Sequence, residues 1–224
     1  MDFQKGSERQ GGTSYSYRRG EILNVATALF AEHGYKPTTV RMIADAAGIL
    51  SGSLYHHFPS KETILEEILR RFLTELNSGF RSIVARGRDS GETLTSLIRY
   101  SFDVIHESGP EVTLFQSELS MIPRRPEFAA IDDLVKENGA IWMQVIERGQ
   151  RSGELRDAVD PEIHYRFMRD AIWSTVTWYR PAGGMSPEQL ASAFVDTLVH
   201  GLWQRPTYGR TDGQSDDRPI AHRA

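Results

Sequence analysis

The sequence predicts an all-α protein with a small N-terminal domain and a larger C-terminal one, and three observations indicate this. Apolar residues recur at helical spacing along most of the 224 residues. No stretch shows the sustained alternation of apolar and polar residues that is typical of strands. Two short helical segments are joined by a three-residue turn that begins with Gly48, which is the arrangement of a helix-turn-helix.

The first helix is expected from about Arg18 to His33, and Gly34 is a natural stop after it. Its apolar residues, such as Ile22 and Phe30, fall on one face. The preceding residues, 1–16, are rich in Gly, Ser and Gln, a composition from which we expect a disordered arm.

Three hydroxyl residues are expected to cap the next helices, because a side-chain oxygen can accept from a free N–H of the first turn. Thr39 precedes a short helix at 40–47, and Ser51 begins another that Pro59 ends. Ser60 then caps a long fourth helix. The helix-turn-helix domain is therefore expected at 17–63.

Five more helices are expected in a ligand-binding and dimerisation domain at 64–204: they cover about 91–107, 111–121, 127–152, 160–181 and 187–203. The last carries an apolar stripe at every fourth residue, formed by Leu190, Phe194, Leu198 and Leu202. It is either an ordinary core helix or a dimer interface. Residues 205–224 lack an apolar period and are expected to form a disordered tail.

Composition excludes several classes of protein. There is no Cys, which rules out disulfides, thiolate metal sites and cysteine nucleophiles. The chain has neither a signal-peptide pattern nor a run of about 18 apolar residues, so we expect a cytoplasmic protein without a membrane partner. The net charge is −4, but Asp45 is the only acid between Lys36 and Lys61. Such a locally basic module is compatible with DNA contact.

The adjacent His56 and His57 first suggest a metal site or a catalytic one. Neighbours on a helix point about 100° apart, so the two imidazoles cannot hold one ion from the same face. The motifs of serine hydrolases, zinc proteases and phosphate-binding loops are also missing from the sequence. We therefore expect no metal, no cofactor and no enzymatic activity.

DNA reading fits this stretch better. Leu54 and Phe58 are four residues apart and would anchor the helix, leaving its other face for a DNA groove. Hydroxyls can donate to phosphates or bases, and glycine lets the backbone approach closely. The residues expected on this face are Ser51, Gly52, Ser53, Tyr55 and His56, with His57 nearer the anchored side.

Residues on both sides of this helix favour the same interpretation. Lys61 falls in the first turn of the fourth helix, where free N–H groups already attract an anion such as a phosphate. Thr39 and Arg41 begin the preceding helix and can act likewise. Each residue alone is as well explained by capping or solvation, but together they favour DNA.

Residues 18–76, and most plainly TTVRMIADAAGILSGSLYHHFPSKETI, resemble the N-terminal domain of the TetR family of bacterial transcriptional regulators. The resemblance implies nine helices in two domains and a homodimer that binds a palindromic operator and is released by a small molecule. It implies a base contact for Arg41. The phosphate contacts that it implies are Thr39, Tyr55, His57 and Lys61.

The segment 164–184 is the informative part of the C-terminal domain. Arg169 and Trp173 are four residues apart and share a helix face with each other. Either the arginines are paired with Glu162 or, between two copies, with Asp170, or they bind an anionic ligand with an apolar body.

The pattern RDxxW…WYRP resembles a branch of the TetR family that represses genes of steroid-ring degradation. It implies a coenzyme A thioester as the effector, contacted by Arg169 and Trp173 and more weakly by Arg166. Other hypotheses remain: a TetR-type regulator of fatty-acid or drug-efflux genes, or an α-helical ligand-binding protein or enzyme whose helix-turn-helix pattern is coincidental.

Overall fold

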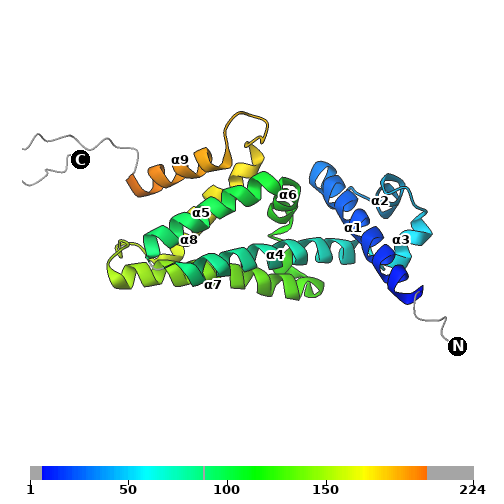
Figure 1. Cartoon of the computed structure of the whole chain (residues 1–224), viewed down its shortest axis with the longest axis horizontal. Helices are drawn as coiled ribbons and strands as arrows, with labels where there is room; N and C mark the ends of the chain where they lie inside the picture. Colours follow the sequence, from blue (N-terminus) through cyan, green and yellow to red (C-terminus); the bar gives the residue numbers. More distant parts are fainter. Residues whose placement is uncertain (1–6, 88, 201–224) are drawn as a thin grey trace, which may run out of the picture.

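The computed structural model describes residues 7–87 and 89–200. Within these ranges the chain forms nine α-helices and three 3-10 turns, without a strand, which confirms the predicted all-α class. A small domain of α1, α2 and α3 lies at one end of the molecule, and the long α4 connects it to a larger helical domain (Figure 1). No helix in the described ranges is long and apolar enough to cross a bilayer.

The N-terminal domain contains α1 (Ser7–His33), α2 (Val40–Ala46) and α3 (Ser51–His57). Helix α1 starts at Ser7 rather than at Arg18, so the expectation of a disordered arm is corrected for residues 7–16, and residues 1–6 lie outside the described part. Tyr15, in these turns, stacks its ring on His57 of α3, and a contact made by one aromatic residue leaves no helical periodicity in the sequence.

Two of the three predicted caps are confirmed. Thr39 accepts from the backbone N–H of Met42 at 3.2 Å, and Ser60 accepts from that of Thr63 at 3.2 Å. The prediction for Ser51 is wrong, because the N-cap of α3 is Leu50 and its side chain makes no capping bond. The carbonyl of Leu50 already accepts from the N–H groups of residues 53 and 54, so the helix begins with Ser51 inside its first turn.

The C-terminal domain is built on α4 (Lys61–Arg86) and α7 (Ala129–Ser152), which pack against each other along the length of the domain (Figure 1). A buried pair sets their register, because Asn138 donates to the Oδ1 of Asn77 at 2.8 Å. The other α-helices are α5 (Ser90–Glu107), α6 (Gly109–Glu118), α8 (Pro161–Ser174) and α9 (Pro187–His200). Two 3-10 turns, η1 (Ile122–Arg124) and η2 (Pro126–Phe128), connect α6 to α7.

Helix α8 ends at Ser174 and continues as a 3-10 turn, η3 (Thr175–Thr177), so the helix predicted to reach 181 is shorter than expected. The buried ring of Tyr179 accounts for the break. Its hydroxyl donates to the carbonyl of Met185 at 3.1 Å and lies 2.9 Å from Nδ1 of His106 in α5. These contacts turn the chain away from a helical path and towards α9.

Candidate DNA-binding and effector sites

Helix α3 presents one face to solvent and buries the other. Leu54 and Phe58 are fully buried, whereas the Tyr55 side chain is 53% exposed. Gly52, Ser53 and His56 are exposed as well, and Ser51 is half-buried. The residues that the sequence assigned to DNA reading therefore share the solvent face of α3.

The start of α2 adds two more side chains to this exposed region. The Arg41 side chain is 85% exposed, and its Nε lies 3.7 Å from the Asp45 carboxylate, a loose and solvated pair. Thr39 uses its hydroxyl oxygen to accept from Met42, so its O–H hydrogen remains free to donate. Both residues can reach an external acceptor without breaking a strong internal contact.

Lys61 does not offer its ammonium group in the same way. Its Nζ donates to the carbonyls of Tyr35 at 2.9 Å, Lys36 at 3.2 Å and Thr38 at 2.9 Å. It also lies over the Tyr35 ring, 4.4 Å from the centroid. An ammonium group has three donors, and all three bind the connection between α1 and α2. From the sequence we expected the Lys61 ammonium to contact a phosphate. In the structure its donors instead join the connection between α1 and α2 to α4.

His57 lies against α1 rather than on the solvent face of α3. Its ring stacks on Tyr15 with 4.7 Å between centroids, and in the described part of the chain its Nδ1 is buried without a hydrogen-bond partner. Burial, followed by the charges of Arg19, Arg18 and His56, lowers the pKa of His57 below its ordinary value of 6.5. The imidazole is therefore neutral near pH 7, and its position does not favour the expected phosphate contact.

Sequence reasoning missed an ion pair behind the DNA-binding helices. Arg19 of α1 donates from Nε to Oε2 of Glu67 at 3.1 Å, and its Nη1 donates to the carbonyl of His57. Its guanidinium lies 4.0 Å from the centroid of the Phe58 ring. Since Arg19 and Glu67 are separated by 48 residues, no local pattern connects them. The pair fixes α1 to α4 at the end of α3.

The arginines predicted to bind an effector are paired within the chain. Arg166 lies 2.6 Å from the Glu162 carboxylate, and Arg169 lies 2.8 Å from that of Asp170. The Arg169 guanidinium also covers the Tyr165 ring, 5.5 Å from its centroid. Trp173 is only 4% exposed. The salt bridges that the sequence offered as an alternative to ligand binding are thus formed inside one chain.

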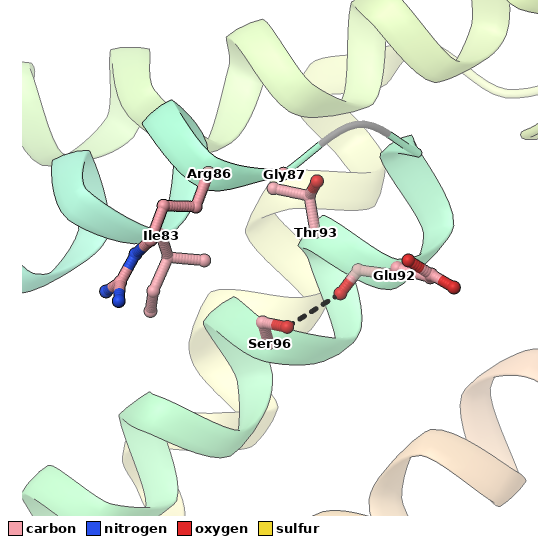
Figure 2. Close-up of a pocket in the computed structure, with 6 residues that line it drawn as sticks. All are labelled: Ile83, Arg86, Gly87, Glu92, Thr93 and Ser96. Atoms are coloured by element: carbon pink, nitrogen blue, oxygen red, sulfur yellow. Dashed lines mark hydrogen bonds between the residues drawn. The ribbon is translucent and has the colours of Figure 1, made fainter.

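Two hollows are found in the larger domain. One, of about 440 Å³, lies where α4 ends and α5 begins; its lining residues are Ile83, Arg86, Gly87, Glu92, Thr93 and Ser96. Figure 2 shows that Ser96 is held by a hydrogen bond to the Glu92 carbonyl. The Arg86 guanidinium is turned away from Thr93 (Figure 2) and donates to Ser82. This hollow contains none of the predicted effector contacts.

The second hollow, of about 340 Å³, is more apolar and is bordered by α5, α7, α8 and α9. Helix α8 contributes His164, Phe167 and Met168 to its lining, residues that sequence reasoning did not select. Arg166, Arg169 and Trp173 are not among its lining residues. The helix chosen from the sequence therefore borders a cavity, but through neighbouring side chains.

The predicted dimer stripe on α9 packs partly against its own chain. Leu190 is 7% exposed, and the Phe194 ring packs edge-on against Phe102 of α5, 5.6 Å between centroids. Leu190 lies in the core of its own chain, and Phe194 is half-buried against that core, so this part of the stripe packs α9 on α5. Leu198 is 44% exposed, and Leu202 lies outside the described residues.

The neighbouring face of α8 and the segment after it expose apolar side chains, of which the sequence had indicated only Trp178, in the WYRP pattern. Ile163 is 42% exposed, Phe167 71% and Trp178 57%. Ile163 and Phe167 are four residues apart, and this spacing was the available signal. Exposed large apolar side chains on one helix face, such as Ile163 and Phe167, are typical of an interaction surface.

Comparison with known proteins gives the family. The model of bacterial regulatory proteins of the tetR family matches residues 22–68, and that of the tetracyclin repressor-like C-terminal domain matches residues 87–202. The transcriptional repressor KstR2 of Rhodococcus jostii is 44% identical over 84% of this chain and 92% of its own. KstR2 of Mycobacterium tuberculosis is 41% identical over 83% of this chain and 92% of its own.

Comparison with solved structures indicates the same family. The ketosteroid transcriptional regulator KstR2 of Mycobacterium tuberculosis superposes with a TM-score of 0.78 at 40% identity, covering 84% of this chain and 96% of that one. These relatives are transcriptional regulators and not enzymes. The chain thus belongs to the TetR family of bacterial regulatory proteins and is a TetR-type transcriptional repressor similar to KstR2.

Proposed function

We propose that the protein binds a palindromic operator as a homodimer and that a small-molecule effector releases it. The observation that carries this proposal is the solvent face of α3, where small residues precede Tyr55 and His56 while Leu54 and Phe58 are buried. A helix with a small, polar outer face can enter the major groove of DNA.

The proposed DNA contacts differ in their chemistry. Arg41, free of any tight ion pair, is suited to the acceptors of a guanine edge. Thr39 and Tyr55 carry hydroxyls that can donate to phosphates. Ser51, Gly52, Ser53 and His56 would lie along the groove. We propose that Lys61 acts by holding the surrounding backbone, because its three donors already bind carbonyls. We propose that His57 packs α3 against Tyr15 instead of contacting a phosphate.

We propose that two copies associate through the outer faces of α8 and α9. Phe167 and Leu198 are exposed in the single chain and border the same hollow, so they form a continuous surface. Burying them against a second copy would remove an unfavourable apolar patch from water. The two α3 helices would then read half-sites that lie one helical turn, about 34–36 Å, or a multiple of it apart. This requires a two-fold symmetric assembly.

The proposed effector is a coenzyme A thioester of a steroid-ring fragment. Support comes from the ketosteroid regulator among the relatives and from the cations on α8. Arg166 and Arg169 are held by carboxylates whose side chains are 59% and 67% exposed. Such solvated pairs contribute only about 0–1 kcal/mol, so the phosphates of coenzyme A can replace the carboxylates. The apolar hollow beside α8 suits the ring fragment.

Release would be a population shift between two arrangements of the DNA-binding domains. Two links can carry it: α4, which spans both domains, and the connection between α6 and α7. Arg125 of that connection lies 3.9 Å from Glu62, and Tyr35 of the N-terminal domain donates to the same carboxylate at 3.1 Å. A movement of the larger domain is thereby transmitted to the base of α2.

Binding of the full chain to the DNA upstream of its own gene, followed by fluorescence anisotropy at increasing salt, tests this function. We expect affinity to fall steeply with salt, because phosphate contacts release counterions. Coenzyme A thioesters of steroid-ring acids should release the DNA, whereas the free acids should not. Weak binding without salt dependence would contradict operator recognition, and release by fatty acyl thioesters alone would assign the repressor to another pathway.

A further inference from the structure

The last carbonyl groups of both short DNA-binding helices face the N-terminal part of α1. Nη2 of Arg18 donates to the carbonyl of Ala47, directly after α2, at 3.2 Å. The hydroxyl of Tyr15 donates to the carbonyl of His56, at the end of α3, at 3.3 Å. Nη1 of Arg19 donates to the carbonyl of His57. Carbonyls in the last turn of a helix have no partner within the helix, and α1 supplies three donors to them.

Tyr15 adds a ring contact to its hydrogen bond. Its ring stacks on the imidazole of His57 at 4.7 Å with an interplanar angle of 29°. The buried Nδ1 of that imidazole has no hydrogen-bond partner in the described part of the chain. Stacking on an aromatic neighbour is a favourable contact for this half-buried ring. Tyr15 therefore holds both the backbone and the last side chain of α3.

A helix as short as α3 depends on such external contacts. Seven residues are too few for a helix to be stable alone in water. Leu54 and Phe58 anchor α3 to the core from one face. Contacts at the end of the helix add to this anchoring.

His56 connects this anchoring to DNA reading. Its backbone carbonyl is held by Tyr15, while its side chain and that of Tyr55 are exposed. In Figure 1 the first turns of α1 lie on the same side of the molecule as α3. A displacement at Tyr15 consequently moves the residues that would contact the groove.

We propose that Tyr15 is a positioning residue for operator recognition: with Arg18 and Arg19 it holds the ends of α2 and α3 and so sets the orientation of the DNA-reading face. This inference rests on the proposed function. It assigns a role in DNA recognition to the turns of α1 that precede Arg18, where the apolar periodicity of the helix begins. Misorientation affects contacts to specific bases more than contacts to phosphates, because base contacts have stricter geometry.

Three full-length variants test the role of Tyr15. Tyr15→Ala removes the ring and the hydroxyl, Tyr15→Phe removes only the hydroxyl, and Tyr17→Ala is the control, because Tyr17 is 72% exposed. Affinity is measured for a duplex from the protein's own promoter and for an unrelated duplex of equal length at the same salt. Thermal unfolding midpoints are recorded for each variant.

We expect Tyr15→Ala to lose about tenfold in promoter affinity, and Tyr15→Phe about threefold, as a lost ring contact and a lost hydrogen bond would give. Affinity for the unrelated duplex should change less than about twofold, and Tyr17→Ala should match the parent on both duplexes.

The positioning role is overturned if Tyr15→Ala and Tyr15→Phe keep the parent's preference for the promoter, or if both duplexes lose affinity equally. If Tyr15→Ala unfolds, Tyr15→Phe decides by the same criterion. A parent that shows no preference for its promoter duplex would overturn the proposed function, and the inference about Tyr15 with it.

Discussion

Arg19 of α1 and Glu67 of α4 form an ion pair at the point where the DNA-binding helices meet the long helix of the larger domain, with Nε 3.1 Å from Oε2. Glu67 is only 6% exposed and also binds Arg71. The pair joins the two elements that position α3, so its loss should affect both stability and DNA binding.

Replacing Arg19 by Met should lower the free energy of unfolding by about 2–3 kcal/mol, because it leaves a buried carboxylate short of its main partner. Arg70→Met is the matched control. Arg70 is exposed and pairs with the half-buried Glu66 at the surface, and its loss should change stability by less than about 1 kcal/mol. Urea unfolding measures both. If both variants lowered the free energy of unfolding equally, the burial of Glu67 would not strengthen its ion pair with Arg19.

Glu67 should also make stability depend on pH. Burial opposes ionisation of its carboxyl, but the hydrogen bonds and charges of Arg19 and Arg71 outweigh burial and lower its pKa below the ordinary value of 4.5. Between the folded and unfolded pKa values the unfolded chain binds more protons, so stability rises with pH in that window.

The contribution of Glu67 is therefore complete above about pH 5, which lies above the unfolded pKa, and is lost as the pH falls through the lowered folded pKa. Urea midpoints of the parent and of Glu67→Gln, measured down to about pH 3.5, should converge in acid. A difference between the two proteins that stays constant over this range contradicts the lowered pKa.

Arg41 and Lys61 should respond differently to removal of their charge. Arg41→Ala is expected to weaken promoter binding by about 1–3 kcal/mol and to reduce discrimination between promoter and unrelated DNA, because it removes a proposed base contact. Its thermal midpoint should match that of the parent, since the Arg41 side chain is 85% exposed. Arg99→Ala, an exposed residue of α5, is the control for loss of charge.

Lys61→Met should instead lower stability by about 1–3 kcal/mol, because three carbonyls of the connection between α1 and α2 lose their donor. The salt dependence of promoter affinity should keep its slope. If the slope of log affinity against log salt concentration fell by about one unit while stability stayed unchanged, Lys61 would instead contact a phosphate.

Arg169→Met should yield a repressor that still binds its promoter but is released poorly by coenzyme A thioesters, since it lacks a proposed phosphate partner. Arg180→Met is the control, because Arg180 is exposed after α8 and, within the described residues, its guanidinium donates to the nearby carbonyls of Thr177 and Tyr179. Release is followed by anisotropy of labelled promoter DNA. Normal release of Arg169→Met, and of Trp173→Leu, would remove these residues from the effector site.

Local patterns in the sequence were enough for much of the DNA-binding domain. The spacing of Leu54 and Phe58 predicted which face of α3 is buried, and Thr39 and Ser60 predicted two helix starts, because burial and capping depend on residues within one turn. The motif around Tyr55 indicated the family for the same reason, since it is contained in one continuous stretch.

The tertiary structure decided what depends on residues far apart in the chain. Tyr15 extends α1 by packing on His57, Lys61 is bound by carbonyls 23 to 26 residues away, and Arg19 meets Glu67 across 48 residues. Leu190 turned inwards because α9 packs on α5. Helical spacing tells which residues share a face, but the partner of that face is chosen by packing and by the pairing of buried charges, which no short stretch of sequence contains.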